Sequence, residues 1–273
     1  MMETNGVQKS LTRVAELRRH RGDYGFDGAL TTVAALIAVG AAGLFLTGLA
    51  FIRARSGRVW LAAIDLLAGL LLLQVLPSYL YSTRRGKFAV WAELLSGLQL
   101  RGDERVLDLG CGRGATLSMV AKAVPSGRAV GLDLWRAQDQ SGNSLETARR
   151  NLDLEGVRGR CEIRTADMRA VPFPDSTFDL VVSSLAIHNI KGRTERLKAI
   201  DEAIRVLKPG GRLLIADVMR TGSYARRLRE RGMESVVEKQ LDWRFWYGAL
   251  GMVTGLVTAT KPTHAFRGPS QQS

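Results

Sequence analysis

The sequence is poor in several residue types that would point to particular classes of protein. Among 273 residues there are only two cysteines, Cys111 and Cys161, which are too few for a disulfide framework and fit a reducing compartment. Acidic residues are outnumbered 26 to 39 by basic ones, and the resulting net charge of +13 suits nucleic acid, anionic lipid or an anionic ligand. No RNA- or DNA-binding motif of the usual kinds accompanies this charge, so we expect no nucleic-acid partner.

Charged residues are absent from a long stretch near the N-terminus. Residues 29–52 (ALTTVAALIAVGAAGLFLTGLAFI) contain none, and as a helix they would extend about 36 Å, more than the roughly 30 Å hydrocarbon core of a bilayer. A second apolar run, residues 59–81, holds one acid, Asp65. These runs are too long and too uniformly apolar for a buried hairpin of a soluble protein, and a signal peptide would not explain the second run. The sequence therefore predicts a two-helix transmembrane hairpin over residues 29–82.

The flanks and the interior of this hairpin suggest its orientation and packing. Basic residues flank both ends, so we expect a basic cytoplasmic arm over residues 1–28 and a cytoplasmic domain after residue 82. Three arginines in the connecting loop, Arg53, Arg55 and Arg58, leave open a shallow or partly re-entrant hairpin. Small residues at positions 40–43 and 48 would let the helices approach closely. Asp65 is either a functional intramembrane acid or a headgroup-level residue that pairs with Arg58.

After Lys87 the pattern changes to an alternation of apolar strands and helices. Strands are expected near residues 105–110, 128–134, 160–167, 178–185 and 212–217, with helical segments between them. Such alternation predicts an α/β fold with a parallel sheet covered on both faces. Sheets of this kind bind ligands beyond the carboxyl ends of their strands, so the residues that follow each strand are the candidates for a site.

Three glycines, Gly110, Gly112 and Gly114, follow the first strand directly. Glycine has no Cβ and adopts positive φ readily, so the backbone can turn sharply and approach a ligand. The spacing differs from the dinucleotide fingerprint, and no Lys-Ser/Thr pair follows, which excludes a phosphate-binding P-loop.

An aspartate lies at the carboxyl end of each of the first three strands. Asp108 would face the positive end of a ligand, Asp133 would accept from two ribose hydroxyls, and Asp167 would accept from the exocyclic amine of a purine. Any one of these acids alone would be unremarkable as a cap or a surface residue. Three of them beside a glycine loop predict a site for a cationic nucleoside.

The segment from about Lys87 to Pro262 resembles the class I S-adenosylmethionine-dependent methyltransferases. Four stretches carry the resemblance, in the order and at the spacings of that family: VLDLGCGRG, VGLDL, TADMRAVPFPDSTFDLVVSS and RVLKPGGRLLIAD. The resemblance implies a methyltransferase domain over residues 83–262 and a seven-stranded, mostly parallel Rossmann-like sheet. The reversed final hairpin would come from ESVVEKQLD and VTGLVTATKP, and a disordered tail would follow over residues 263–273.

The resemblance also implies S-adenosylmethionine as the cofactor and no metal. Gly110 and Gly112 would line its methionine part, Asp133 would hold the ribose, Asp167 and Met168 would frame the adenine, and Ser184 would lie near the methionine carboxylate. The predicted cofactor-binding residues are Asp108, Gly110, Cys111, Gly112, Gly114, Asp133, Leu134, Asp167, Met168 and Ser184. Cys111 is either a packing residue or redox-sensitive, and Trp135 either shields the adenine or covers a helix edge.

Methyl transfer from a sulfonium needs orientation and a dry site, and it needs a general base when the acceptor carries a tightly held proton. His188 and Asn189 follow the fourth strand, and either could act there or only orient the loop. The quinone C-methyltransferases, which this region resembles, have Arg-Asn in a similar place, so the same acceptor does not follow. Residues 241–253 are rich in aromatic residues and would line a substrate pocket, dip into the bilayer or pack on the hairpin.

We therefore predict a membrane-anchored methyltransferase with the lipid bilayer as a partner and its catalytic domain in the cytoplasm. Its acceptor would be small or lipophilic, of quinone, isoprenoid, sterol or fatty type. Two alternatives stay open: methylation of a soluble small molecule, and a non-catalytic cofactor-binding scaffold in the membrane.

Overall fold

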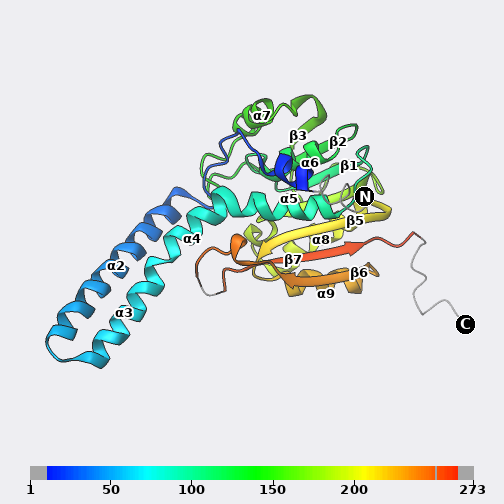
Figure 1. Ribbon diagram of the computed structural model, residues 1–273. Helices are drawn as coiled ribbons and strands as arrows, with labels where there is room; N and C mark the ends of the chain where they lie inside the picture. Colours follow the sequence, from blue (N-terminus) through cyan, green and yellow to red (C-terminus); the bar gives the residue numbers. More distant parts are fainter. Residues whose placement is uncertain (1–10, 250, 264–273) are drawn as a thin grey trace, which may run out of the picture.

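The computed structural model describes residues 11–249 and 251–263 and contains one seven-stranded sheet in the order β3-β2-β1-β4-β5-β7-β6 (Figure 1). The strands are β1 (Arg105–Leu109), β2 (Arg128–Asp133), β3 (Cys161–Thr165), β4 (Phe178–Ser184), β5 (Leu207–Val218), β6 (Glu234–Gln240) and β7 (Thr254–Thr260). Strands β1 to β5 pair in parallel, while β7 runs antiparallel to both β5 and β6. The predicted mostly parallel sheet with a reversed final hairpin is confirmed.

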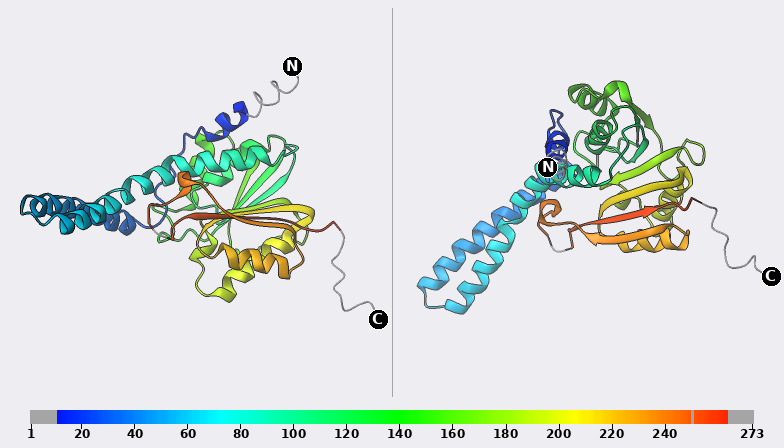
Figure 2. Two further views of the ribbon diagram at one scale, coloured as in Figure 1. Left: turned by 60° about the horizontal axis from the view of Figure 1, so that its bottom comes forward. Right: turned by 45° about the vertical axis from the view of Figure 1, so that its right-hand side comes forward.

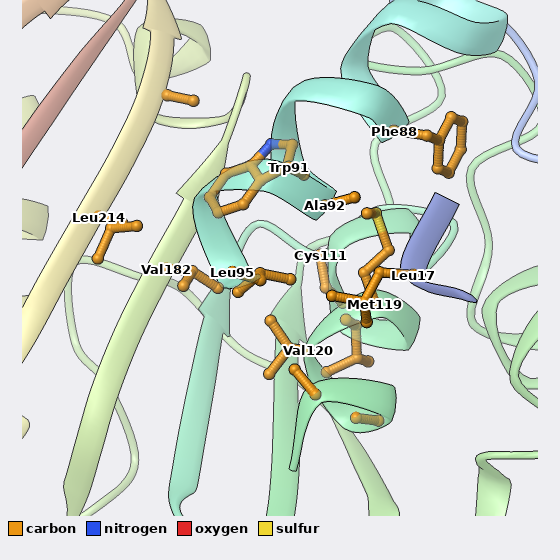
Figure 3. Close-up of a cluster of buried hydrophobic side chains, with 14 of the residues drawn as sticks. Leu17, Phe88, Trp91, Ala92, Leu95, Cys111, Met119, Val120, Val182 and Leu214 are labelled. Carbon is orange, nitrogen blue, oxygen red and sulfur yellow. The ribbon is translucent and has the colours of Figure 1, made fainter. Parts of the chain in front are cut away.

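Helices cover both faces of the sheet. Helices α5 (Lys87–Gly97), α6 (Ala115–Ala123) and α7 (Leu145–Leu154) pack into one hydrophobic cluster, and α8 (Arg193–Val206) and α9 (Thr221–Glu230) pack into a second. Side chains alternate along β1, so that Val106 joins the first cluster while Leu107 joins the second. In Figure 3, Trp91 and Leu95 of α5 lie over Val182 and Leu214 of the sheet. This double covering explains why the central strands β1, β2 and β4 are buried along almost their whole length.

Two long helices project from the domain side by side (Figures 1 and 2). They are α2 (Leu30–Arg55) and α3 (Val59–Leu73), and α3 continues through α4 (Val75–Tyr81) and a π-helical turn (Ser82–Gly86) into α5. Both helical stretches, Leu30–Arg55 and Val59–Gly97, are long and apolar enough to cross a membrane. Only 11% and 22% of their most apolar windows are buried, which argues against the core hairpin of a soluble protein.

The two helices touch through small residues. A Cβ on Gly43 would lie 3.0 Å from the carbonyl oxygen of Gly69, so the backbones meet there, whereas Gly40 faces open space. Asp65 pairs with Arg53, at 2.5 Å, and not with Arg58 as expected. The reason is direction: Asp65 lies on the face of α3 that packs on α2, whereas Arg58 precedes the helix.

The N-terminal arm packs against the sheet domain before it enters α2. Residues 11–18 are helical, and Leu17 is buried in the first cluster. The Tyr24 hydroxyl donates to Glu155, and the Arg113 guanidinium donates to Asp23 at 2.8 Å. Residues 1–10, with Lys9 of the arm, and residues 264–273, which hold most of the predicted tail, lie outside the described residues.

Candidate active site

A cleft opens at the carboxyl ends of the central strands, and it has two parts. The large hollow, about 430 Å³, lies between the glycine loop and the base of the hairpin, and the small hollow, about 210 Å³, lies beyond β2 and β3. Three residues, Asp133, Asp139 and Asn189, line both parts, so the hollows are two ends of one cleft. This is the edge of the sheet where the alternation of strands and helices predicted a site.

The glycine loop forms one wall of the large hollow. Gly110 and Gly112 both line the hollow and have positive φ, +75° and +49°. A Cβ would lie 2.2 Å from Ala186 Cβ at the first position and 2.4 Å from Gln140 Oε1 at the second. Glycine is therefore required by conformation at both positions, and also by space at Gly110, where the neighbour is a Cβ and not the end of a flexible side chain. Cys111 also lines the hollow, but burial raises the pKa of its thiol, which makes a packing role the better interpretation.

Replacing Gly110 with alanine tests whether the steric clash of an added Cβ matters in addition to the strain of a positive φ. Gly156 is a matched control, because it has φ +70° but nothing within 4 Å of an added Cβ. We expect Gly156→Ala to cost about 1 kcal/mol of unfolding free energy, from backbone strain alone. Gly110→Ala should destabilise the protein more and weaken cofactor binding at least about tenfold, since Ala186 must move. Thermal unfolding and calorimetric titration measure both; equal effects of the two changes would contradict this reading of the loop.

Asp133 ends β2 at the junction of the two hollows. Its carboxylate accepts hydrogen bonds from the backbone amides of Gly112, at 2.8 Å, and Trp135, at 2.6 Å. The side chain of Asn143 donates to it over a longer 3.3 Å. These contacts fix the orientation of Asp133 and tie it to the glycine loop. Trp135 lines neither hollow; its indole donates to Thr165, so it covers the edge of the sheet.

The small hollow is lined by Asp167 and Met168, which the resemblance assigns to the adenine. Leu134, another predicted cofactor-binding residue, lies there too. The Arg169 guanidinium donates to both oxygens of Asp167, and these hydrogen bonds lower the pKa of that carboxyl. Asp167 is thus held as an anion beside the hollow, although Arg169 takes much of its accepting capacity.

Two predicted site residues line neither hollow. Asp108 does not line the cleft. Side chains alternate along β1, so the Asp108 side chain lies on the same face of the sheet as Val106, beneath the helices. Asp108 is only 1% exposed. Burial, together with the negative charge of Asp133, raises the pKa of Asp108 to about 8. Gly114 precedes α6 at φ +84° and shapes the turn without lining the cleft. Ser184 does line the large hollow and accepts a hydrogen bond from the indole of Trp91.

His188 and Asn189 lie in a short helical turn after β4, and both line the large hollow. Nδ1 of His188 lies 2.5 Å from Asp217 Oδ1, and the His188 amide donates to the other oxygen of Asp217. Burial lowers the pKa of His188, but the hydrogen bond to Asp217 and the charges of Asp217, Asp139 and Asp27 outweigh it and raise the pKa. A neutral His188 that donates from Nδ1 keeps Nε2 free to accept a proton.

Sequence reasoning missed two sets of residues at or beside the cleft. Asp217 is the second-to-last residue of β5 and contacts His188, and its place at the end of RLLIAD was a usable signal, because the other acids also lie at strand ends. Asp27, Lys87 and Tyr247 line the large hollow and form a cluster in which the lysine and the tyrosine both donate to the aspartate. No local pattern connects these three, because they are brought together only by the tertiary fold.

The far wall of the large hollow is apolar and comes from the base of the hairpin and from the linker after β6. Leu36 belongs to α2, Val75 to α4, and Met252 to the linker. The Gln74 side chain donates to the Gly248 carbonyl at 2.6 Å, so the linker packs on α4. Of the three roles considered for residues 241–253, lining the cleft and packing on the hairpin are both seen.

Comparisons with known proteins agree with this geometry. The methyltransferase domain family matches residues 107–215. A ubiquinone/menaquinone biosynthesis C-methyltransferase UbiE from Pseudomonas fluorescens (strain SBW25) is 38% identical over 124 residues, which are 45% of this chain and 44% of the relative. The corresponding protein of Pasteurella multocida (strain Pm70) is 36% identical over 43% of this chain and 41% of its own. The chain thus spans less than half the length of the curated relatives that it matches.

Solved structures show the same fold. A SAM-dependent methyltransferase from Aquifex aeolicus matches with a TM-score of 0.50 and 22% identity, over 67% of this chain and 93% of its own. The [4+2]-cyclase SpnF matches with a TM-score of 0.52 and 21% identity, over 63% and 80%. Because one of the two is named for a cyclisation, this fold alone does not determine the reaction. The methyltransferase domain matched over residues 107–215 and the curated relatives, together with this fold, support a class I S-adenosylmethionine-dependent methyltransferase, with S-adenosylmethionine as cofactor.

Proposed function

We propose that the chain is a membrane-anchored methyltransferase that transfers a methyl group to a small lipophilic acceptor. One observation carries the proposal: the large hollow joins the glycine loop and His188 on one side to apolar side chains of the hairpin base on the other. A water-soluble acceptor would not need Leu36, Val75 and Met252 as its wall.

The cleft fits S-adenosylmethionine, which supplies a methyl group already activated on a sulfonium. Gly110 and Gly112 line the large hollow with backbone alone, and Asp133 presents a carboxylate where the two hollows meet. We assign the small hollow, with Asp167 and Met168, to the adenine, and the glycine side of the large hollow to the methionine part. The apolar remainder of the large hollow is left for the acceptor.

His188 would act as the general base. Asp217 accepts from Nδ1 and holds the ring, so Nε2 would take the proton from the acceptor as the new bond to the methyl group forms. Asp217 is fully buried, so water does not compete for this contact. Asn189 lies at the junction of the hollows and would orient cofactor and acceptor relative to each other.

The hairpin would anchor the enzyme in a bilayer with the catalytic domain in the cytoplasm. Large apolar side chains are exposed along both helices, among them Leu44 and Phe45 on α2 and Leu67 and Leu71 on α3. Trp60, at the loop end, is 86% exposed, as expected for an indole at a membrane interface. Tyr79, near the other end of the second apolar run, is buried, and its hydroxyl donates to the Asp27 carbonyl.

The curated relatives support an acceptor of quinone type, since their names place them in ubiquinone and menaquinone biosynthesis. Anchoring would then raise the concentration of a bilayer-dissolved acceptor around the active site. This argument concerns the class of acceptor only, because the match covers less than half of either chain.

A labelling assay tests the proposal. The full chain in phospholipid vesicles receives methyl-labelled S-adenosylmethionine and a total lipid extract, and we expect label in the organic phase, in a product identified by mass. The His188→Ala variant is the control and should reduce that label by about 10²-fold or more. Label confined to the aqueous phase would favour a soluble acceptor. Tight cofactor binding without any turnover would favour the scaffold and overturn the proposal.

A further inference from the structure

Hydrogen bonds hold the base of the hairpin in a fixed position against the active site. The carboxylate of Asp27, just before α2, accepts from Lys87 Nζ at 2.6 Å, from the Thr83 hydroxyl at 2.7 Å and from the Tyr247 hydroxyl at 2.7 Å. These donors come from α5, the π-helical turn and the linker after β6. Charged hydrogen bonds of this kind are among the stronger ones, and the Lys87 side chain is only 6% exposed. The start of α2 is therefore fixed against the cleft.

The cleft extends along the fastened helices into the apolar span. Thr32 and Leu36 of α2 and Val75 of α4 line the large hollow. Leu36 lies six residues into α2, which is about 9 Å along the helix. Its neighbour Ile37 points outward and is 58% exposed. One helix thus presents Leu36 to the active site and Ile37 to its surroundings, at the same depth.

The linker after β6 covers the hollow from another side. A Cβ on Gly248 would lie 2.8 Å from the Cα of Val75, so the linker and α4 are in backbone contact. Tyr247, Ala249 and Met252 of the linker line the hollow next to this contact. Apolar groups of α2, α4 and the linker thus line the acceptor end of the cleft beyond the Asp27–Lys87–Tyr247 cluster, and such groups suit a hydrocarbon chain better than a peptide or a sugar.

We propose that the base of the hairpin is a binding site for the apolar chain of the acceptor, which reaches the active site from the bilayer along α2 and α4. This inference rests on the proposed function for its acceptor, but it assigns a second role to helices that otherwise serve only as an anchor. Leu36 is a specificity residue of this site, and the head group of the acceptor lies between His188 and the glycine loop.

Photolabelling tests the site without knowledge of the natural acceptor. The probe is a long-chain fatty alcohol with a diazirine at the end of its chain, in phosphatidylcholine vesicles that contain the full protein. We expect label on Val75 and Met252, and we expect Leu36→Trp to reduce it about tenfold, equivalent to about 1.4 kcal/mol. Ile37→Trp is the matched control, one residue away and outward, and should leave the label on Val75 and Met252 unchanged.

A smaller replacement guards against misfolding as the explanation. Leu36→Ala enlarges the site and should keep the label, and all three variants should bind S-adenosylmethionine as the natural protein does. Equal labelling of Val75 and Met252 in the two tryptophan variants, or no label on them in the natural protein, would overturn the inference. The proposed function is judged apart from this, by methyl label in the lipid phase. If Leu36→Trp and Ile37→Trp methylate the lipid acceptor equally well, the proposed function stands and only the binding site at the hairpin base is ruled out.

Discussion

Replacement of Asp133 with alanine is expected to weaken binding of S-adenosylmethionine by about two orders of magnitude or more. Two contributions are lost together: the carboxylate that would accept from the ribose, and the acceptor that holds the Gly112 and Trp135 amides in place. Hydrogen bonds to a charged group contribute about 1.5–3 kcal/mol each, so losing two weakens binding by about 3 kcal/mol or more. That energy corresponds to a loss of affinity of about 150-fold.

Calorimetric titration of the full chain in detergent micelles measures this loss. Asp153→Ala is the control, since Asp153 is an exposed acid on α7 and lines neither hollow. Asp133→Asn separates the two contributions, because an amide keeps one accepting oxygen but has no charge, and it should fall between the natural protein and the alanine variant. An unchanged affinity in Asp133→Ala would show that the cofactor does not bind at the end of β2.

Removal of the base or of its aspartate partner is expected to slow methyl transfer without loss of cofactor binding. His188→Ala should lower kcat by about 10²–10⁴-fold, the usual contribution of a general base. Asp217→Asn should lower it less, since the base remains but loses its charged partner. Tyr224→Phe is a milder control, because the Tyr224 hydroxyl donates to Asp217 over a long 3.3 Å.

The pH dependence distinguishes a base from a residue that only orients the loop. His188 must be neutral to accept a proton, so the rate should fall as the pH drops through its pKa. That pKa lies above the ordinary value of 6.5, because the contacts to Asp217 outweigh burial. In Asp217→Asn both contacts weaken, and the acid limb of the rate profile should move to lower pH. If the pH–rate profiles of the natural protein and of Asp217→Asn coincide, the role of His188 as general base is contradicted.

Local patterns predicted the parts of this protein that depend on near neighbours in the chain. The strands follow from apolar runs, the hairpin from uncharged length, and the loop from the spacing of its glycines. The same alternation rule, applied within β1, would have placed Asp108 beside Val106 and beneath the helices. Asp108 lines neither hollow, so its assignment to the cofactor stays a prediction.

The features that the sequence did not reveal depend on distant contacts. Asp27 meets Lys87 across 60 positions and Tyr247 across 220, and no pattern in the chain marks them as partners. Asp65 was expected to pair with the nearest arginine, but the antiparallel crossing of α2 and α3 brings Arg53 to it. The apolar wall of the large hollow had the same origin, since α2, α4 and the linker after β6 meet only in the folded chain.

A structure of the full chain bound to S-adenosylhomocysteine tests the central claim most directly. We predict the adenine in the small hollow beside Asp167 and Met168, the ribose hydroxyls on Asp133, and the sulfur facing the hollow between His188 and Leu36. A sulfur that points away from that hollow, or a ligand bound outside the cleft, would contradict this account.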